Sequence, residues 1–351
     1  MYNFSPTEII DEFAATASRL SQGWETLKNV REVTVATTPK KCVWQKDKVT
    51  LHQYIRETPA TITTPILIVY ALVNRYDMMD LQEDRSFVRN LQAGGADIFL
   101  VDWGYPAPED KYYTMDEYIN GYLNDAVDAV IQLSKAEKIT VMGICQGGTF
   151  SIIYSALHPE KVQNLVTLVT PVDFATQNDM LGKWARHLDA DALVDSHGII
   201  PGELLNRGFE RLKPMLKTNK YLNILASGEE AQVVNFLRME KWINDSPPQA
   251  GECFRQFIKD LYQQNKLVQG TFVIGGQKVN LNRITMPLLN IYAAQDHLVP
   301  PAASIALNNL VGSTDKSLVE FPGGHIGVFT GARSQKELAP GITSWLKERE
   351  N

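Results

Sequence analysis

The sequence predicts an α/β protein with a mostly parallel sheet that one large helical insertion interrupts. Strands that are buried on both faces appear as continuous apolar runs, and four such runs occur in the first half of the chain, at 65–72, 97–104, 139–145 and 164–172. Helix-length segments separate them, the clearest being 115–136, where apolar residues recur at helical spacing. The strand pattern stops after about residue 173 and returns at 287–296 and 316–325.

The N-terminal part precedes this pattern. Residues 1–30 are expected to form a helical segment, because Ile9, Ile10 and Phe13 begin one apolar face. Residues 33–38 and 42–55 then alternate apolar and polar side chains around Asp47, which predicts an antiparallel pair of strands at a sheet edge.

The interruption of the strand pattern defines the expected domains. Residues 31–173 and 269–351 should form the α/β core, and residues 174–268, which are helical and polar in character, a cap inserted into it. An insertion that follows a strand in an α/β enzyme usually covers the active site. We therefore expect the cap to act as a lid.

Composition excludes several classes of protein. The 351 residues carry 34 Lys and Arg against 40 Asp and Glu, a net charge of −6, and no basic run favours nucleic acid. No apolar run has membrane-spanning length, and the N-terminus lacks the features of a signal peptide. The three widely spaced cysteines form no disulfide framework, which suits a reducing cytosol. We expect a soluble intracellular protein.

The motif with most chemical content is Gly143-Ile144-Cys145-Gln146-Gly147, which lies between a predicted strand and a predicted helix. It has the form of the nucleophile elbow G-x-S-x-G, with cysteine in place of serine. Cys145 could be the nucleophile of a variant hydrolase, the nucleophile of a transferase, or a buried structural residue. A helix N-terminus at this place would stabilise a thiolate and present amides to an oxyanion, which favours catalysis.

Two later residues support the catalytic interpretation. Asp296 and His325 each follow a predicted strand, and the order Cys145, Asp296, His325 is that of the nucleophile, acid and histidine in α/β-hydrolases. Because sites in open α/β sheets lie at the carboxyl ends of strands, we expect these residues to form a triad on an α/β-hydrolase fold. His297 is not the expected catalytic histidine, because its neighbour Asp296 fits the acid position and only His325 follows a late strand through a Gly-Gly turn.

The oxyanion hole should be formed by backbone amides. The donor next to the nucleophile is that of Gln146, and the second normally comes from the loop after the third strand. Here that loop is 71–75, and the amide of Val73 is the candidate. No histidines or carboxylates have metal-ligand spacing, so we expect neither a metal nor a cofactor.

These residues together resemble the PhaC family, the catalytic subunits of polyhydroxyalkanoate synthases. The family's G-x-C-x-G-G box is matched around Cys145, and the similarity extends over about residues 40–345. Further matching stretches are 67–91, Asp102-Trp103-Gly104, TPVDF at 170–174, Trp242 with Asp245, Asn265, and Asp296-His297 followed by Pro300. Gln146 and the short length point to the class III type, which works with a second subunit, PhaE. Class IV enzymes pair with PhaR and usually have methionine at this position, so they rank second.

The resemblance implies polymerisation of (R)-3-hydroxyacyl-CoA, such as 3-hydroxybutyryl-CoA, into a polyester at the surface of a cytoplasmic granule. CoA would be released, and the growing chain would be held as a thioester of Cys145. Thioester exchange is close to energetically neutral, which explains the choice of sulfur. His325 would deprotonate Cys145, and the 3-hydroxyl would lose its proton to Asp296, directly or through His325. A homodimer or a larger complex is expected.

Two other functions remain open from the sequence. A cysteine-nucleophile hydrolase, such as a thioesterase or a lactone hydrolase, would share the fold and the triad. A non-catalytic scaffold that retains a hydrolase fold at a granule surface is the second alternative.

Overall fold

A computed structural model describes residues 6–30, 32–177, 179–212, 224 and 229–350. Its centre is an eight-stranded sheet in the order β1-β2-β6-β3-β7-β8-β13-β14. The strands are β1 (Lys40–Lys46), β2 (Val49–Tyr54), β6 (Ile98–Asp102), β3 (Ile66–Val69), β7 (Ile139–Ile144), β8 (Val162–Leu168), β13 (Leu288–Ala293) and β14 (Lys316–Phe321). From β6 to β14, all neighbouring strands in this order are parallel. Strand β2 is antiparallel to both of its neighbours, β1 and β6. The predicted α/β fold with a mostly parallel sheet is therefore confirmed.

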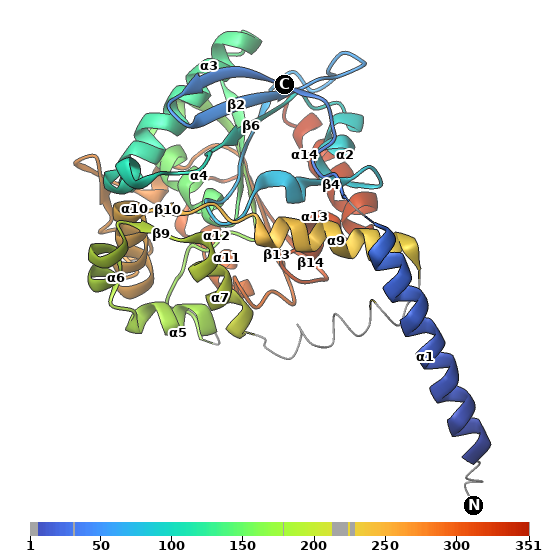
Figure 1. Cartoon of the computed structure of the whole chain (residues 1–351). Coiled ribbons are helices and arrows are strands. Elements are labelled where there is room, and N and C mark those ends of the chain that lie inside the picture. The colour runs from blue at the N-terminus through green and yellow to red at the C-terminus, as the bar shows by residue number, and fades with distance from the viewer. Residues whose placement is uncertain (1–5, 31, 178, 213–223, 225–228, 351) are drawn as a thin grey trace, which may run out of the picture.

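Helices cover both faces of the sheet (Figure 1). In the central strands, successive side chains alternate between two cores: Leu67 and Val69 of β3 face one core, and Ile66 and Ile68 face the other. The first core packs against α3 (Asn124–Ser134), α4 (Gln146–Leu157), α10 (Gly251–Gln256) and the π-helix η3 (Glu117–Leu123). The second packs against α2 (Phe87–Ala93), α13 (Gly327–Thr330) and α14 (Ala339–Lys347). Burial on both faces explains the continuous apolar runs.

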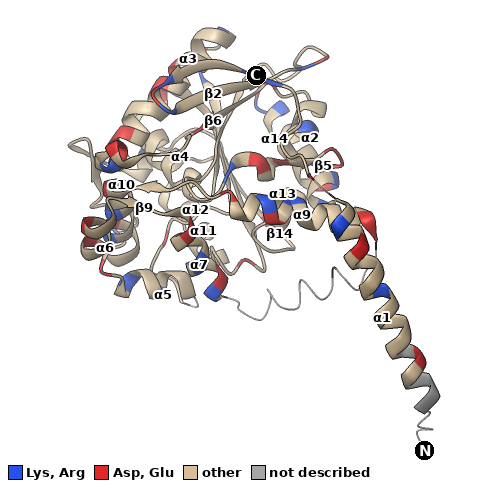
Figure 2. Cartoon of the chain, in the orientation of Figure 1, with Lys and Arg blue, Asp and Glu red and all other residues tan. Residues whose placement is uncertain are grey.

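The segment predicted as the cap is largely helical where the structure describes it. Its helices are α5 (Met180–His187), α6 (Ala190–His197), α7 (Gly202–Leu212), α9 (Glu230–Asn244), α10 and the π-helix η5 (Phe257–Gln263). Residues 178, 213–223 and 225–228 of the same prediction lie outside the described residues. Acidic and basic side chains both occur on α9 and around α6 (Figure 2).

The N-terminal segment contains one long helix, α1 (Pro6–Asn29), which projects from the body and contacts α9 (Figure 1). The predicted strand pair around Asp47 is present as β1 and β2. The prediction of a strand at 33–38 is wrong, because these residues form no strand. Backbone groups there bond to other partners. The carbonyls of Val33 and Thr34 accept hydrogen bonds from Lys241 (2.9 Å) and Arg238 (3.0 Å) of α9.

Candidate active site

Cys145 lies in a strained turn between β7 and α4. Its backbone has φ 51° and ψ −123°, a conformation that L-residues rarely adopt and that costs about 1–3 kcal/mol. The turn is fixed on both sides, because the Cys145 amide donates to Leu168 O (3.0 Å) and its carbonyl accepts from the amide of Gly148 (2.9 Å). The side chain is partly exposed at the N-terminus of α4.

Glycines allow this turn to pack closely. A Cβ atom at Gly147 would meet the carbonyl oxygens of Val69 and Tyr70 at the end of β3. Those atoms belong to the backbone of the central sheet and cannot rotate away. The spacing of glycines around the cysteine therefore reflects contact between α4 and β3.

Replacing Gly147 by alanine should consequently reduce the free energy of unfolding by about 1–3 kcal/mol, the usual cost of overpacking a well-packed interior. Urea denaturation measures this change. Gly341→Ala is the matched control, since that glycine lies in α14 and its added Cβ would meet nothing within 4 Å. Equal stability of the two variants would contradict the close approach.

The structure brings Asp296 and His325 together. Both follow parallel strands, β13 and β14, and His325 Nδ1 lies 2.6 Å from Asp296 Oδ2. The other carboxylate oxygen, Oδ1, accepts hydrogen bonds from the amides of Leu298 (2.9 Å) and Val299 (3.0 Å). The Asp296 side chain is fully buried. Both of its oxygens are thus occupied by groups of the protein.

His325 also interacts with Cys145, so the three predicted catalytic residues share one location. Burial lowers the pKa of His325, but the carboxylate of Asp296 and the sulfur of Cys145 outweigh that effect and raise this pKa from 6.5 to about 10. The side chains of Cys145 and His325 are within hydrogen-bonding reach. A histidine with a raised pKa is a strong proton acceptor for a neighbouring thiol.

This shift predicts a pH dependence of stability. Because the pKa of His325 is higher in the folded state, its stabilising contribution is complete below about pH 6.5 and is lost as the pH rises towards about 10. The difference in unfolding free energy between the wild type and His325→Gln should therefore shrink across that interval. Urea denaturation at about pH 6, 8 and 10 measures it. A difference that grows with pH would show that the sign is wrong.

The predicted oxyanion loop, residues 71–75, lies beside α4. The buried side chain of Gln146 accepts a hydrogen bond from the amide of Leu72 (3.2 Å), which ties the loop to the first turn of the helix. The backbone amide of Gln146 is at the helix N-terminus, where no carbonyl of the same helix can accept a hydrogen bond from it. With the Leu72 amide engaged, that of the next residue, Val73, remains the candidate for the second donor. The contact from the Gln146 side chain left no signal in the sequence.

The cap reaches the region of Cys145. Burial raises the pKa of Tyr262 in η5, and the charges of Asp179 and Cys145 raise it further. Asn265, just after η5, accepts a hydrogen bond from the Phe174 amide (3.1 Å) and donates to Asp173 (2.9 Å). Asn265 therefore joins the two ends of the predicted cap.

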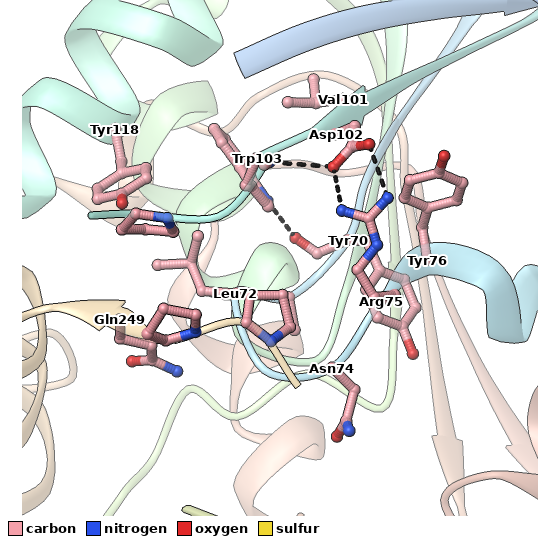
Figure 3. Close-up of a pocket in the computed structure, with 15 residues that line it drawn as sticks. Tyr70, Leu72, Asn74, Arg75, Tyr76, Val101, Asp102, Trp103, Tyr118 and Gln249 are labelled. Atoms are coloured by element: carbon pink, nitrogen blue, oxygen red, sulfur yellow. Dashed lines mark hydrogen bonds and ion pairs between the residues drawn. The ribbon is translucent and has the colours of Figure 1, made fainter. Parts of the chain in front are cut away.

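A small pocket lies behind the oxyanion loop (Figure 3). Its wall includes the bidentate ion pair between Arg75 and Asp102 (2.7 and 2.8 Å) and the Trp103 indole, which donates to Tyr70 O (2.8 Å). The three predicted catalytic residues do not line it. The pocket thus shows how the loop is supported rather than where a substrate would react.

Three further observations concern other parts of the described chain. The thiol of Cys253 is buried, and burial strongly raises its pKa, whereas Cys42 is exposed on β1. Across the described part of the chain, no three His, Cys, Asp or Glu side chains are grouped so that they could hold a metal ion. Among the described helices, none combines the length and apolarity needed to cross a bilayer.

The sheet order, the strained turn after β7, and the acid and histidine at strand ends define an α/β-hydrolase fold. A family model of that fold matches residues 64–332. Solved structures agree: a bacterial membrane phospholipase A aligns with a TM-score of 0.54 at 16% identity, covering 98% of each chain. A putative lipase from Acinetobacter baumannii gives 0.51 at 12% identity, covering 95% of this chain and 96% of its own. At these identities the likeness concerns the fold alone.

Sequence comparison identifies the family within this fold. A model described as the N-terminus of poly-beta-hydroxybutyrate polymerase (PhaC) matches residues 10–91. The poly(3-hydroxyalkanoate) polymerase subunit PhaC of Allochromatium vinosum is 50% identical over 98% of both chains. The subunit of the same name from a Synechocystis strain is 47% identical, over 98% of this chain and 94% of its own. The chain belongs to the PhaC family of poly(3-hydroxyalkanoate) polymerases.

Proposed function

We propose that this chain is an acyltransferase that polymerises (R)-3-hydroxyacyl-CoA into polyhydroxyalkanoate and releases CoA. The observation that carries the proposal is a cysteine in the strained turn, in reach of a buried His325–Asp296 pair, in a member of the PhaC family. Short-chain monomers such as 3-hydroxybutyryl-CoA are the proposed substrates.

In the first step, Cys145 Sγ attacks the thioester carbonyl after its proton has passed to His325. The amides of Gln146 and Val73 are the proposed donors to the resulting oxyanion. When the intermediate collapses, the bond from the acyl carbon to the CoA sulfur breaks, and His325 returns its proton to that sulfur. The acyl group remains a thioester, so it keeps its activation for the next transfer.

In the second step, the 3-hydroxyl of another acyl unit attacks the acyl-cysteine. An ester forms, the bond between the acyl carbon and Cys145 Sγ breaks, and the hydroxyl proton must reach a base. We assign that proton to His325, because both oxygens of Asp296 are already engaged and its side chain is fully buried. Asp296 then acts through the histidine. Both steps use only side chains, backbone amides and the acyl-CoA, so we propose neither a cofactor nor a metal.

The cap, residues 174–268, is the proposed lid that keeps water from the acyl-enzyme, since water in place of the 3-hydroxyl would make the enzyme a thioesterase. We further propose a cytoplasmic location at the surface of polyester granules, a homodimer or larger complex, and a second subunit. That subunit would be PhaE, supported by Gln146 and the chain length, with PhaR as the second choice.

The test is incubation of the full chain with (R)-3-hydroxybutyryl-CoA, alone, with PhaE and with PhaR. CoA is measured by chromatography and polymer as insoluble ester. CoA release matched by insoluble polyester supports the proposal, and the more active combination identifies the second subunit. Stoichiometric free 3-hydroxybutyrate would instead support a cysteine hydrolase. No CoA release in any combination would support a non-catalytic scaffold.

A further inference from the structure

The C-terminal end of α9, in the cap, is hydrogen-bonded directly to the oxyanion loop. The side-chain amide of Asn74 donates to the carbonyl of Ile243 (3.3 Å) and to the Ser246 hydroxyl (2.6 Å). The Trp242 indole donates to the Arg75 carbonyl (2.6 Å). These contacts join residues about 170 positions apart, and they lie beside the proposed oxyanion donor, Val73.

A second cap helix takes part in the same network. Ser246 Oγ donates to the side-chain oxygen of Asn206 in α7 (2.8 Å), and the side-chain NH₂ group of Asn206 donates to Ile243 O (2.7 Å). Asn74, Ser246 and Asn206, which we call the cap latch, thus form a closed set of hydrogen bonds around the end of α9. All three side chains are partly buried, where hydrogen bonds are better protected from exchange with water.

The cap latch fixes the backbone conformation of the loop next to Val73. Asn74 has φ 57°, a left-handed conformation that its side-chain bonds help to maintain. On the other side of Val73, the Leu72 amide is bonded to Gln146. The orientation of the Val73 peptide is therefore set by an anchor on α4 and an anchor on the cap.

The loop has a third anchor on the sheet. Arg75 forms its bidentate pair with Asp102 at the end of β6, and in Figure 3 the Asn74 side chain points away from that pair. Departure of the cap would leave the sheet anchor in place but would remove the bonds to Asn74 and to the Arg75 carbonyl. The loop would then keep its position and lose its local conformation.

We propose that the cap latch positions the oxyanion loop, so that the Val73 amide points at the acyl carbonyl only while α7 and α9 are docked. Asn74, Ser246 and Asn206 are positioning residues that need not touch the substrate. A cap that moves to admit acyl-CoA would disable the oxyanion hole at the same time, so the acyl-enzyme would be least reactive when water could enter. This inference rests on the proposed function, because it concerns the donor assigned to that site.

The test uses the full chain with its second subunit and the variants Asn74→Gly, Ser246→Ala and Asn206→Ala. Glycine suits position 74 because it keeps access to the left-handed backbone. We expect kcat for 3-hydroxybutyryl-CoA to fall about 10–100-fold, less than the loss of an entire oxyanion donor. KM and the rate of Cys145 alkylation by iodoacetamide should change less than about threefold, because ground-state binding and the thiol are untouched.

Three controls separate positioning from general damage. Ser246→Thr retains the hydroxyl and should recover most of the activity. Asn244→Ala removes an exposed side-chain amide of α9 that donates to Glu240 O of the same helix, and it should behave as wild type. The double variant Asn74→Gly/Ser246→Ala should lose less than the product of the two single fold-losses, because both substitutions remove the bond between Asn74 and Ser246. A parallel fall in kcat, alkylation rate and melting temperature, or wild-type kcat in all three latch variants, would overturn the proposal.

Hydrogen exchange gives a readout that does not need activity. Amides of residues 71–75 should exchange at least about tenfold faster in the latch variants than in the wild type or in Asn244→Ala. Unchanged exchange would overturn the latch whatever the enzyme makes. If the loop loosens as expected but the wild type forms no polymer, the proposed function fails and the latch stands.

Discussion

Cys145→Ala should abolish both CoA release and polymer formation, with a loss of about 10⁴-fold or more, as when the nucleophile of a catalytic triad is removed. Alanine retains the Cβ atom and the helix, so folding should persist while no group remains to form the thioester. Chromatographic measurement of CoA from 3-hydroxybutyryl-CoA gives the rate, and mass spectrometry of the protein shows whether an acyl adduct forms.

The matched control is Cys42→Ser, which changes an exposed thiol on the edge strand β1. This variant should retain wild-type turnover, and iodoacetamide should still inactivate it by alkylating Cys145. The Cys145→Ala variant should show no alkylation at position 145. Cys145→Ser tests the chemistry of sulfur: a hydroxyl is harder to deprotonate, and its ester is a less activated acyl donor. Turnover of the alanine variant at more than a small fraction of the wild-type rate would refute the role of Cys145.

Asp296→Asn should lower the rate of CoA release by about 10²–10⁴-fold, the usual contribution of general acid–base catalysis. The asparagine oxygen can still accept from the amides of Leu298 and Val299, so the loop should keep its shape. Its NH₂ group would then face His325 Nδ1 and force that nitrogen to accept a hydrogen bond. The other ring nitrogen would carry the proton and could no longer take one from the thiol.

The same variant tests the route of the second proton. Because Asp296 is expected to act through His325, Asp296→Asn should slow the first-turnover release of CoA and chain elongation to a similar extent. His325→Gln should show the same pattern. Rapid-quench measurement separates the two steps. A full first-turnover burst followed by no elongation would mean that Asp296 receives the hydroxyl proton directly.

The parts of the fold that depend on local pattern could be predicted from the sequence. Apolar runs marked the parallel strands because both sheet faces are covered, and strand-end positions brought Asp296 and His325 into one region. The strand predicted at 33–38 was wrong. The segment has the alternating polar and apolar residues of a strand, but its backbone carbonyls accept hydrogen bonds from side chains of α9. Alternation reports side-chain environment and carries no information about which group the backbone bonds to.

The support of the site could not be predicted in this way. The bonds of Asn74 to Ile243 and Ser246 join segments that no spacing rule connects. The bond from the Leu72 amide to the side chain of Gln146 joins a loop and a helix that no sequence pattern connects. Such contacts depend on where the cap lies on the core, which is a property of the whole tertiary structure.

The order of the strands has a consequence for synthesis of the chain. Leu165 of β8 pairs with Leu288 of β13, so β8 remains an open edge of the sheet until more than a hundred further residues have left the ribosome. The elbow at Cys145 can form in the growing chain well before Asp296 and His325 exist. A chain that ends before β14 would therefore contain the proposed nucleophile without its proposed base, together with an unpaired apolar strand edge. We expect such fragments to aggregate rather than to show partial activity.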